Sequence, residues 1–261
     1  MKYKFKNSKS NLERLYFFLG LLEGDGSIQV NHWKKRYLQF RIVIKLKNTT
    51  ANYEMLAEFR DFFNPIFNLT VSKNNQNILL MQNDQRKLKL FICLIESYTQ
   101  GFLLTKYRKR YSFFCYALSK KINYSEYKYI KNELGLNDEW SGYSSIVPYD
   151  TNFLLNSNFG GFDSWLLGFI EAEGCFCCRK SGSHSFSISQ KGEKNIMKAI
   201  QRKFKLPNKI QDKNFYFLET ASRKKVKEII EFCHNQSLPG LKGEKRFQLQ
   251  QFEQVFYKPR V

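Results

Sequence analysis

The sequence lacks long apolar runs, a secretory leader and a dense set of cysteines. Its longest apolar stretch, Leu15 to Leu22, contains Gly20 and stops at Glu23, far short of the roughly 18 residues that span a bilayer. No charged segment leading into an apolar run opens the chain, so we expect no secretion. Six cysteines in 261 residues are too few for a disulfide scaffold and indicate a reducing compartment. These absences predict a folded protein without a membrane partner.

Acidic residues are also scarce, because 23 Asp and Glu stand against 43 Lys and Arg, for a formal net charge of +20. Such an excess favours a polyanionic partner, since binding phosphates releases counterions from nucleic acid. Lys, Asn, Phe, Tyr and Ile are abundant, and A/T-rich codons encode them all. This usage indicates an organellar origin, mitochondrial in the first place, with a chloroplast or a bacterial cytoplasm as alternatives.

The chain contains one pattern twice. Leu19-Gly-Leu-Leu-Glu-Gly-Asp-Gly-Ser-Ile28 returns as Leu167-Gly-Phe-Ile-Glu-Ala-Glu-Gly-Cys-Phe176, at an offset of 148 residues. Two further matches follow in the same order: 55–63 with 196–204, and 77–83 with 214–220. The ordered matches predict two copies of one fold.

Each copy has the pattern of a helix, two strands, a helix, two strands and a helix. In the first copy we expect a helix capped by Ser10 and Glu13 and stopped by Gly26 as a left-handed cap. In the second copy we expect Asp163 to cap the matching helix. A hairpin with alternating polar and apolar residues follows each helix. The prediction is an α+β protein with repeats at 1–118 and 162–261, joined by a surface tether at 119–161.

Small residues four positions apart mark the repeated helix, as Gly20 and Gly24 in the first copy and Gly168 and Ala172 in the second. They allow two helix backbones to approach closely, so we expect the two helices to pack on each other around a pseudo-twofold axis.

Each repeated helix also ends in carboxylates, although the C-terminal end of a helix already carries partial negative charge. Pairing the two ends would bring Asp25 and Glu173 together. Carboxylate and backbone carbonyl oxygens are the ligands that Mg²⁺ prefers, so the pattern predicts a divalent-cation site there.

These helices resemble the two signature helices of the LAGLIDADG homing endonucleases in their single-chain form. The resemblance implies two αββαββα halves whose antiparallel sheets form a saddle on duplex DNA. It implies that Asp25 and Glu173 bind Mg²⁺, with Mn²⁺ or Ca²⁺ able to take the same sites, helped by the carbonyls of Gly24 and Ala172. It further implies that Glu23 and Glu171 form hydrogen bonds across the helix pair.

The implied reaction is hydrolysis of one phosphodiester bond in each strand of a long pseudo-palindromic target by a monomer, leaving 5′-phosphate and 3′-hydroxyl ends. The segment from Leu241 to Lys245 is similar to the one that carries the family's lysine, so Lys245 is the candidate. Tyr107 takes the matching position in the first copy, where Lys106 or Arg108 must substitute. Other positions similar to those near the scissile phosphate are Gln190, Lys191 and either Lys45 or Lys47.

Alternation along the hairpins selects the residues expected to contact the major groove. In the first hairpin and its turn they are Gln29, Asn31, Lys34, Arg36, Gln39, Arg41 and Lys45. In the second they are Arg179, Lys180, His184, Ser185, Ser187 and Lys191. The alternative is a solvated polar face of an ordinary antiparallel sheet.

Other functions have less support. Cys175 and Cys178 have the spacing of a zinc pair, but no second pair follows at finger spacing, so we expect these cysteines to pack in the core. A maturase that binds intron RNA, or a non-cleaving DNA-binding protein of the same fold, is the main alternative. Both signature acids are present, which favours cleavage.

Overall fold

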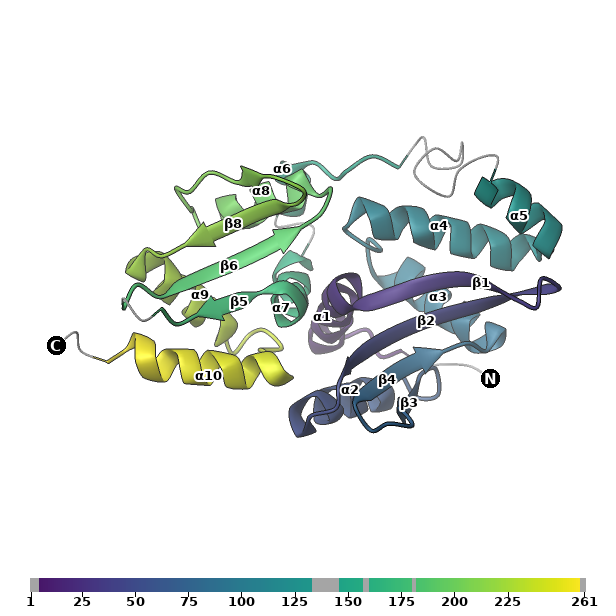
Figure 1. Ribbon diagram of the computed structural model, residues 1–261, viewed down its shortest axis with the longest axis horizontal. Coiled ribbons are helices and arrows are strands. Elements are labelled where there is room, and N and C mark those ends of the chain that lie inside the picture. The colour runs from purple at the N-terminus through teal and green to yellow at the C-terminus, as the bar shows by residue number, and fades with distance from the viewer. Residues whose placement is uncertain (1–4, 133–145, 157–159, 180–181, 259–261) are drawn as a thin grey trace.

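A computed structural model describes residues 5–132, 146–156, 160–179 and 182–258 of the chain (Figure 1). It confirms the α+β class and the repeated order of elements. The first repeat holds α1 (Lys9–Asp25), β1 (Gly26–Trp33), β2 (Tyr37–Lys47), α2 (Thr50–Phe62), β3 (Asn68–Val71), β4 (Asn77–Gln82), α3 (Gln85–Tyr98) and α4 (Thr105–Lys120). The second holds α7 (Phe162–Glu173), β5 (Cys175–Cys177), β6 (Ser185–Gln190), α8 (Lys194–Lys203), β7 (Gln211–Asp212), β8 (Tyr216–Thr220), α9 (Arg223–Cys233) and α10 (Glu244–Phe256).

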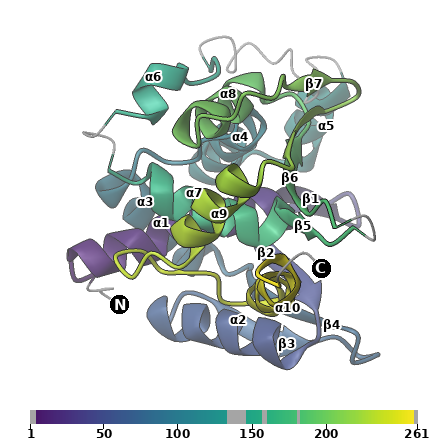
Figure 2. The same cartoon turned by 90° about the vertical axis from the view of Figure 1, so that its left-hand side faces the viewer.

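Each repeat forms one four-stranded antiparallel sheet, and the strand order is equivalent in both. The orders are β1-β2-β4-β3 and β5-β6-β8-β7. The two sheets lie on either side of the paired helices α1 and α7 (Figure 1). Helices cover one face of each sheet, as Figure 2 shows for α8 and α9 on the second. We call the opposite face of each sheet its open face.

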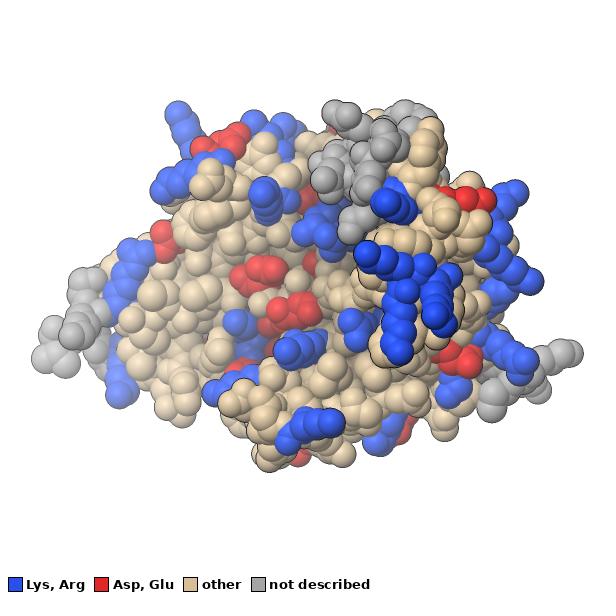
Figure 3. All heavy atoms as spheres, turned by 45° about the vertical axis from the view of Figure 1, so that its right-hand side comes forward, with Lys and Arg blue, Asp and Glu red and all other residues tan. Residues whose placement is uncertain are grey.

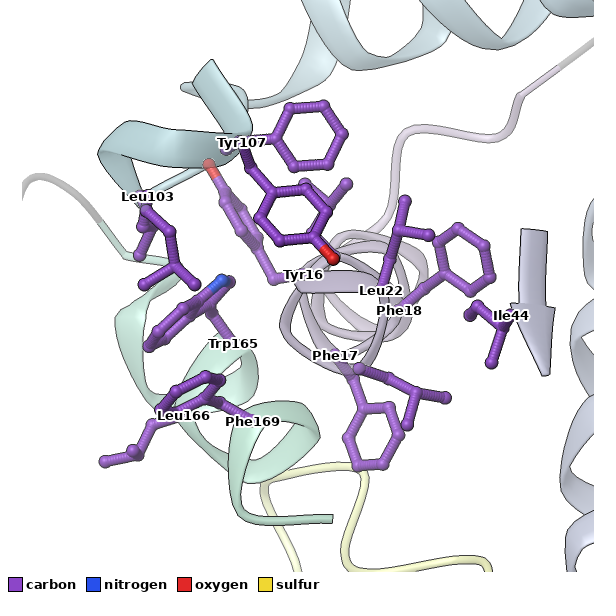
Figure 4. Packing of buried hydrophobic residues seen from close by; sticks show 14 of the residues in the cluster. Tyr16, Phe17, Phe18, Leu22, Ile44, Leu103, Tyr107, Trp165, Leu166 and Phe169 are labelled. Carbon is purple, nitrogen blue, oxygen red and sulfur yellow. The ribbon is translucent and has the colours of Figure 1, made fainter. Parts of the chain in front are cut away.

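The helix pair is in close contact, as the small residues predicted (Figure 4). A methyl group on Gly20 would overlap the carbonyl oxygen of Trp165, and one on Gly168 would overlap that of Phe17. The side chains of Trp165 and Phe17 are fully buried around this contact. Two backbones this close leave no room for a side chain at either glycine, so the pair is held at one separation.

Three expected helix ends are wrong. Ser8 caps α1 by accepting a hydrogen bond from the Asn11 amide, so the helix begins before the expected capping box at Ser10. Gly161 precedes α7, which leaves Asp163 inside the first turn. Gly26 has an extended backbone with φ −97°. A glycine is still required there, because a Cβ would lie 2.5 Å from the carbonyl oxygen of Leu22.

The segment between the repeats packs more than a surface tether would. It contains α5 (Tyr124–Asn132) and α6 (Thr151–Leu154). Tyr127 and Leu154 are buried, and the Tyr127 hydroxyl donates to the carbonyl oxygen of Val30 at 3.2 Å. Residues 133–145 of the expected tether lie outside the described residues. Among those described, no helix has both the length and the apolar character that crossing a bilayer requires.

Candidate active site and nucleic-acid interface

The two signature acids meet at the centre of the molecule. Asp25 is the last residue of α1 and Glu173 the last of α7. A methyl group on Gly24 would overlap the Cβ atom of Ala172 and lie 3.3 Å from the Cγ atom of Glu173. Acidic side chains accordingly gather in the middle of the face in Figure 3, with basic side chains around them. The helix pair thus brings together two carboxylates that are far apart in the sequence.

Burial and neighbouring charges shift the pKa values of the two carboxyl groups. Partial burial raises the pKa of Asp25 to about 6, against the opposing charge of Lys245. Burial first, and then the negative charge of Asp25, raises the pKa of Glu173, while Lys245 and Lys106 lower it. The negative charge of Asp25 thus disfavours ionisation of Glu173, and that of Glu171 disfavours ionisation of Asp25. A bound divalent cation would relieve that repulsion.

The oxygen atoms at this site suit a divalent cation that takes some of its ligands from the protein and the others from water or a bound phosphate. Asp25 and Glu173 both keep solvent-accessible surface despite their partial burial, so their oxygens can reach a ligand. The carbonyl groups in the last turns of α1 and α7 add oxygen donors of the kind that Mg²⁺ and Ca²⁺ prefer. In the part of the chain that the structure describes, no three His, Cys, Asp or Glu side chains gather around a common point. The remaining ligands would therefore be water or phosphate oxygens.

The first acids of the two motifs are structural anchors. Glu23 is fully buried and accepts hydrogen bonds from the Trp165 indole of the other helix and from the Leu104 amide, the latter at 2.8 Å. Glu171 does not bond across the pair as expected. It accepts from the amides of Lys242 and Lys245 at 2.9 and 3.1 Å, within its own repeat. Burial raises the pKa of both carboxyl groups.

The candidate basic residues differ between the repeats. The Lys245 ammonium donates to Gln248 at 3.0 Å, and Lys245 shares a cavity of about 160 Å³ with Asp25. At the matching position, the Tyr107 hydroxyl donates to the carbonyl oxygen of Gly26 at 2.5 Å. Arg108 is turned away, because it donates to the carbonyl oxygen of Val147 and stacks on a linker tyrosine. Lys106 therefore fits the first site better than Arg108.

The first sheet presents long polar side chains on its open face. Gln29 pairs directly with Arg41, whose Nε and Nη2 atoms donate to the Gln29 amide oxygen at 3.0 and 2.6 Å. Alternating burial along β2 leaves Gln39, Lys45 and Lys47 exposed. Asn31 is exposed on the same face, and Lys34 and Arg36 project from the turn. The candidates of the first hairpin therefore share one surface.

The second sheet differs, because shorter side chains stand at the equivalent register, and Ser185, expected to contact DNA, is buried and donates to Glu219 at 2.8 Å. Cys177 pairs with Ser185 in the register that Gln29 and Arg41 occupy in the first sheet, and Cys175 pairs with Ser187. Cys175 and Cys178 are exposed, so the expectation that they pack in the core is wrong. Strand alternation turns Cys175 to the open face, and Cys178 lies beyond the end of β5.

Several candidates of the second repeat lie elsewhere than expected. The His184 ring contacts Phe252 and faces α10, not the open side of the sheet. Gln190 pairs with Tyr216 in the sheet. It therefore lies on the same face as the buried residues Ile188 and Leu218, opposite the open face.

The charged candidates of the second repeat are only in part available. Arg179 forms an ion pair with Glu219, and Lys191 is exposed. Lys180 lies outside the described residues.

Two buried polar residues were missed by reasoning from sequence. Asn52 on α2 accepts a hydrogen bond from the Glu244 amide at 3.0 Å. Glu193 accepts from the Lys106 amide and the Thr105 hydroxyl, both at 3.1 Å. Each joins one repeat to the first turn of a helix in the other. Asn52 and Glu193 are 141 positions apart, the same offset as between the repeated segments 55–63 and 196–204. This equivalence was the signal available in the sequence.

Comparison with known proteins agrees with this architecture. A protein of Dictyostelium citrinum named "Probable intron-encoded endonuclease aI3" is 33% identical over 92% of this chain and 94% of its own length. A protein of that name from Debaryomyces hansenii is 29% identical over 87% of this chain, which spans only 36% of that longer protein.

Solved structures have the same fold at lower identity. The LAGLIDADG meganuclease I-AabMI bound to uncleaved DNA has a TM-score of 0.65 at 20% identity, covering 92% of this chain and 89% of its own. I-SmaMI, bound to uncleaved DNA in the presence of calcium ions, has a TM-score of 0.65 at 14% identity, covering 92% and 90%. The family model described as LAGLIDADG endonuclease matches residues 18–118 and 166–256. The chain belongs to the LAGLIDADG endonuclease family.

Proposed function

We propose that this protein is a site-specific endonuclease that cuts both strands of duplex DNA at one target. The observation that carries the proposal is the meeting of Asp25 and Glu173 at the junction of two pseudo-symmetric sheets. One junction with two carboxylates suits one duplex with two strands. The net charge of +20 favours the DNA backbone.

Asp25 and Glu173 would hold divalent cations with the carbonyl groups of Gly24 and Ala172. A bound Mg²⁺, or Mn²⁺ or Ca²⁺ in its place, would polarise the phosphate and lower the pKa of a water molecule. Glu23 and Glu171 keep the helix ends in place through their buried hydrogen bonds.

Lys245, with Lys106 on the other side, supplies positive charge beside the reacting phosphate. Hydrolysis leaves 5′-phosphate and 3′-hydroxyl ends.

The open faces of the two sheets contact the DNA, with the hairpins in the major groove. Gln29, Asn31, Gln39 and Arg41 read bases in one half of a long pseudo-palindromic target. Lys34, Arg36, Lys45 and Lys191 contact phosphates. Because both repeats belong to one chain, the protein acts as a monomer.

We infer a mitochondrial location, since the relatives include proteins named as intron-encoded and one named as mitochondrial. Intron RNA is the alternative partner, for a maturase. A DNA-binding protein that does not cleave is the second alternative.

The test is a Mg²⁺-dependent cleavage selection on a random duplex library, followed by assays on the selected target. We expect Asp25→Asn and Glu173→Gln to abolish double-strand cleavage while DNA affinity in Ca²⁺ changes less than about threefold. The control is Asp163→Asn, at the far end of α7, which should cut like wild type. Wild-type protein that binds duplex DNA but never cuts it, or that selects only structured RNA, would reject the proposal.

A further inference from the structure

The first turn of α10 is held by residues from both repeats. Asn52, buried on α2, accepts a hydrogen bond from the Glu244 amide at 3.0 Å and donates to the carbonyl oxygen of Lys47 at 3.1 Å. Glu244 begins the helix whose second residue is Lys245. A residue of the first repeat therefore anchors the segment that carries the basic residue of the second.

This segment is anchored by a buried carboxylate of its own repeat as well. Glu171 accepts from the amides of Lys242 and Lys245. A Cβ atom on Gly243 would lie 2.6 Å from the Asn52 amide oxygen and 2.8 Å from a Glu171 carboxylate oxygen. The turn before α10 is thus clamped between one polar side chain of each repeat. Because Asn52 is buried, its bond does not compete with water.

The same connection occurs at the opposite, pseudo-symmetric position. Glu193 of the second repeat accepts from the Lys106 amide of the first, at 3.1 Å. Glu23 takes the place of Glu171 and accepts from the Leu104 amide. Asn52 and Glu193 are different residue types at equivalent places, and they form the same crossed bond. The bond is therefore a feature of the architecture of both repeats.

We propose that Asn52 is a positioning residue that acts across the repeat boundary, fixing the first turn of α10 so that Lys245 lies beside Asp25 and Glu173. The inference rests on the proposed function. Without Asn52 the Glu244 amide loses its acceptor, and the helix start can shift. A displacement of about 1 Å in a reacting group can slow a reaction by up to roughly a hundredfold. We expect the effect to fall mainly on one strand, because Lys106 stands beside the acids from the other repeat and would serve the other cut.

The experiment measures the cutting rate of each strand separately, on a duplex labelled differently at its two 5′ ends. The selected target and saturating protein in Mg²⁺ are used, so that rates report chemistry and not binding. Lys245→Met identifies the strand that depends on Lys245. We expect Asn52→Ala to slow that strand about tenfold and the other less than twofold.

A second variant removes the donor and leaves Asn52 intact. Proline is favoured in the first turn of a helix, where Glu244 stands, and it lacks the amide hydrogen that Asn52 accepts. Glu244→Ala removes the same side chain but keeps the amide, and so provides the reference. We expect Glu244→Pro to cut the Lys245-dependent strand about tenfold more slowly than Glu244→Ala. The double variant Asn52→Ala with Glu244→Pro should be no slower than either single variant, because both lose the same bond.

Loss of the helix cap in α2 is a separate effect and has its own control. Thr49→Ala removes the side chain that caps α2 through the Asn52 amide, without contacting α10. This variant should slow neither strand selectively. The inference is overturned if Asn52→Ala slows both strands equally, or if Glu244→Pro and Glu244→Ala cut at equal rates. It is also overturned if the effects of Asn52→Ala and Glu244→Pro multiply in the double variant. Absence of any cleavage by wild type would instead overturn the proposed function.

Discussion

The two repeats have the same backbone fold and differ in the surface that they offer to DNA. The open face of the first sheet presents a hydrogen-bonded pair, Gln29 and Arg41, at the register where the second sheet has Cys177 and a buried Ser185. Long side chains with several donors can reach base edges, whereas cysteine and serine are short. The sequence-specific contacts are therefore expected to concentrate in the first repeat.

Near the helix pair the two repeats are alike. Gly20 and Gly168 occupy equivalent positions, and Glu23 and Glu171 both accept amide hydrogen bonds from the start of a following helix. The comparison shows which parts the fold itself requires. Close helix packing tolerates little change, while the open face can vary because only a partner contacts it.

The largest expected effect comes from breaking the shared helix contact. Gly168→Ala places a methyl group on the carbonyl oxygen of Phe17 and forces the helices apart. We expect the free energy of unfolding to fall by about 3 kcal/mol or more, measured by urea denaturation. Ala172→Gly, one turn later on α7, should cost only about 1 kcal/mol, the difference in helix propensity. A Gly168→Ala protein with wild-type stability would show that the helices do not pack as described.

An intermediate effect is expected from the surface where the repeats differ. Arg41→Ala removes a guanidinium that Gln29 holds over the open face, and a bidentate contact to a base contributes about 1–3 kcal/mol. We expect DNA affinity in Ca²⁺ to fall about tenfold or more, with relaxed preference at one base pair. Cys177→Ala, at the position of the second sheet that matches Gln29, the partner of Arg41, should change affinity less than about twofold. Fluorescence anisotropy with single-substitution targets makes the measurement, and equal losses for both variants would contradict the comparison.

The smallest effect concerns Glu193, whose counterpart in the first repeat is Asn52. Burial raises the pKa of Glu193 from 4.5, so folding favours its protonated form. Stability from this group is complete below about pH 4.5 and is lost as pH rises through the raised pKa. Glu193→Gln, which brings this position closer to its neutral counterpart, should show a smaller fall in melting temperature between pH 5 and pH 8. Parallel melting curves for the two proteins would rule this out.

Contiguous motifs and strand alternation could be interpreted from the sequence. The repeated helix identified Asp25 and Glu173 because acids and small residues follow one another within a single turn. The two-residue period placed Gln29 and Arg41 on one face, as the register shows. Both inferences rely on geometry that is local to one element.

Contacts between distant segments could not be predicted. Asn52 and Glu244 are 192 positions apart, and Glu193 and Lys106 are 87 apart. No periodicity within one element connects such residues. The choice between Lys106 and Arg108 could not be made for the same reason, since the linker residue Tyr149 that stacks on the Arg108 guanidinium is 41 positions away.

By itself the sequence determined that there are two copies of one αβ unit, which residues end the paired helices, and which hairpin faces are polar. Helix and strand periods, small-residue spacing and charge carry that information within short stretches. Only the tertiary structure decided that each repeat anchors a helix of the other, and that the Tyr107 hydroxyl donates to the carbonyl oxygen of Gly26. Those arrangements depend on how two preformed surfaces fit, and close packing selects one fit that no single segment encodes.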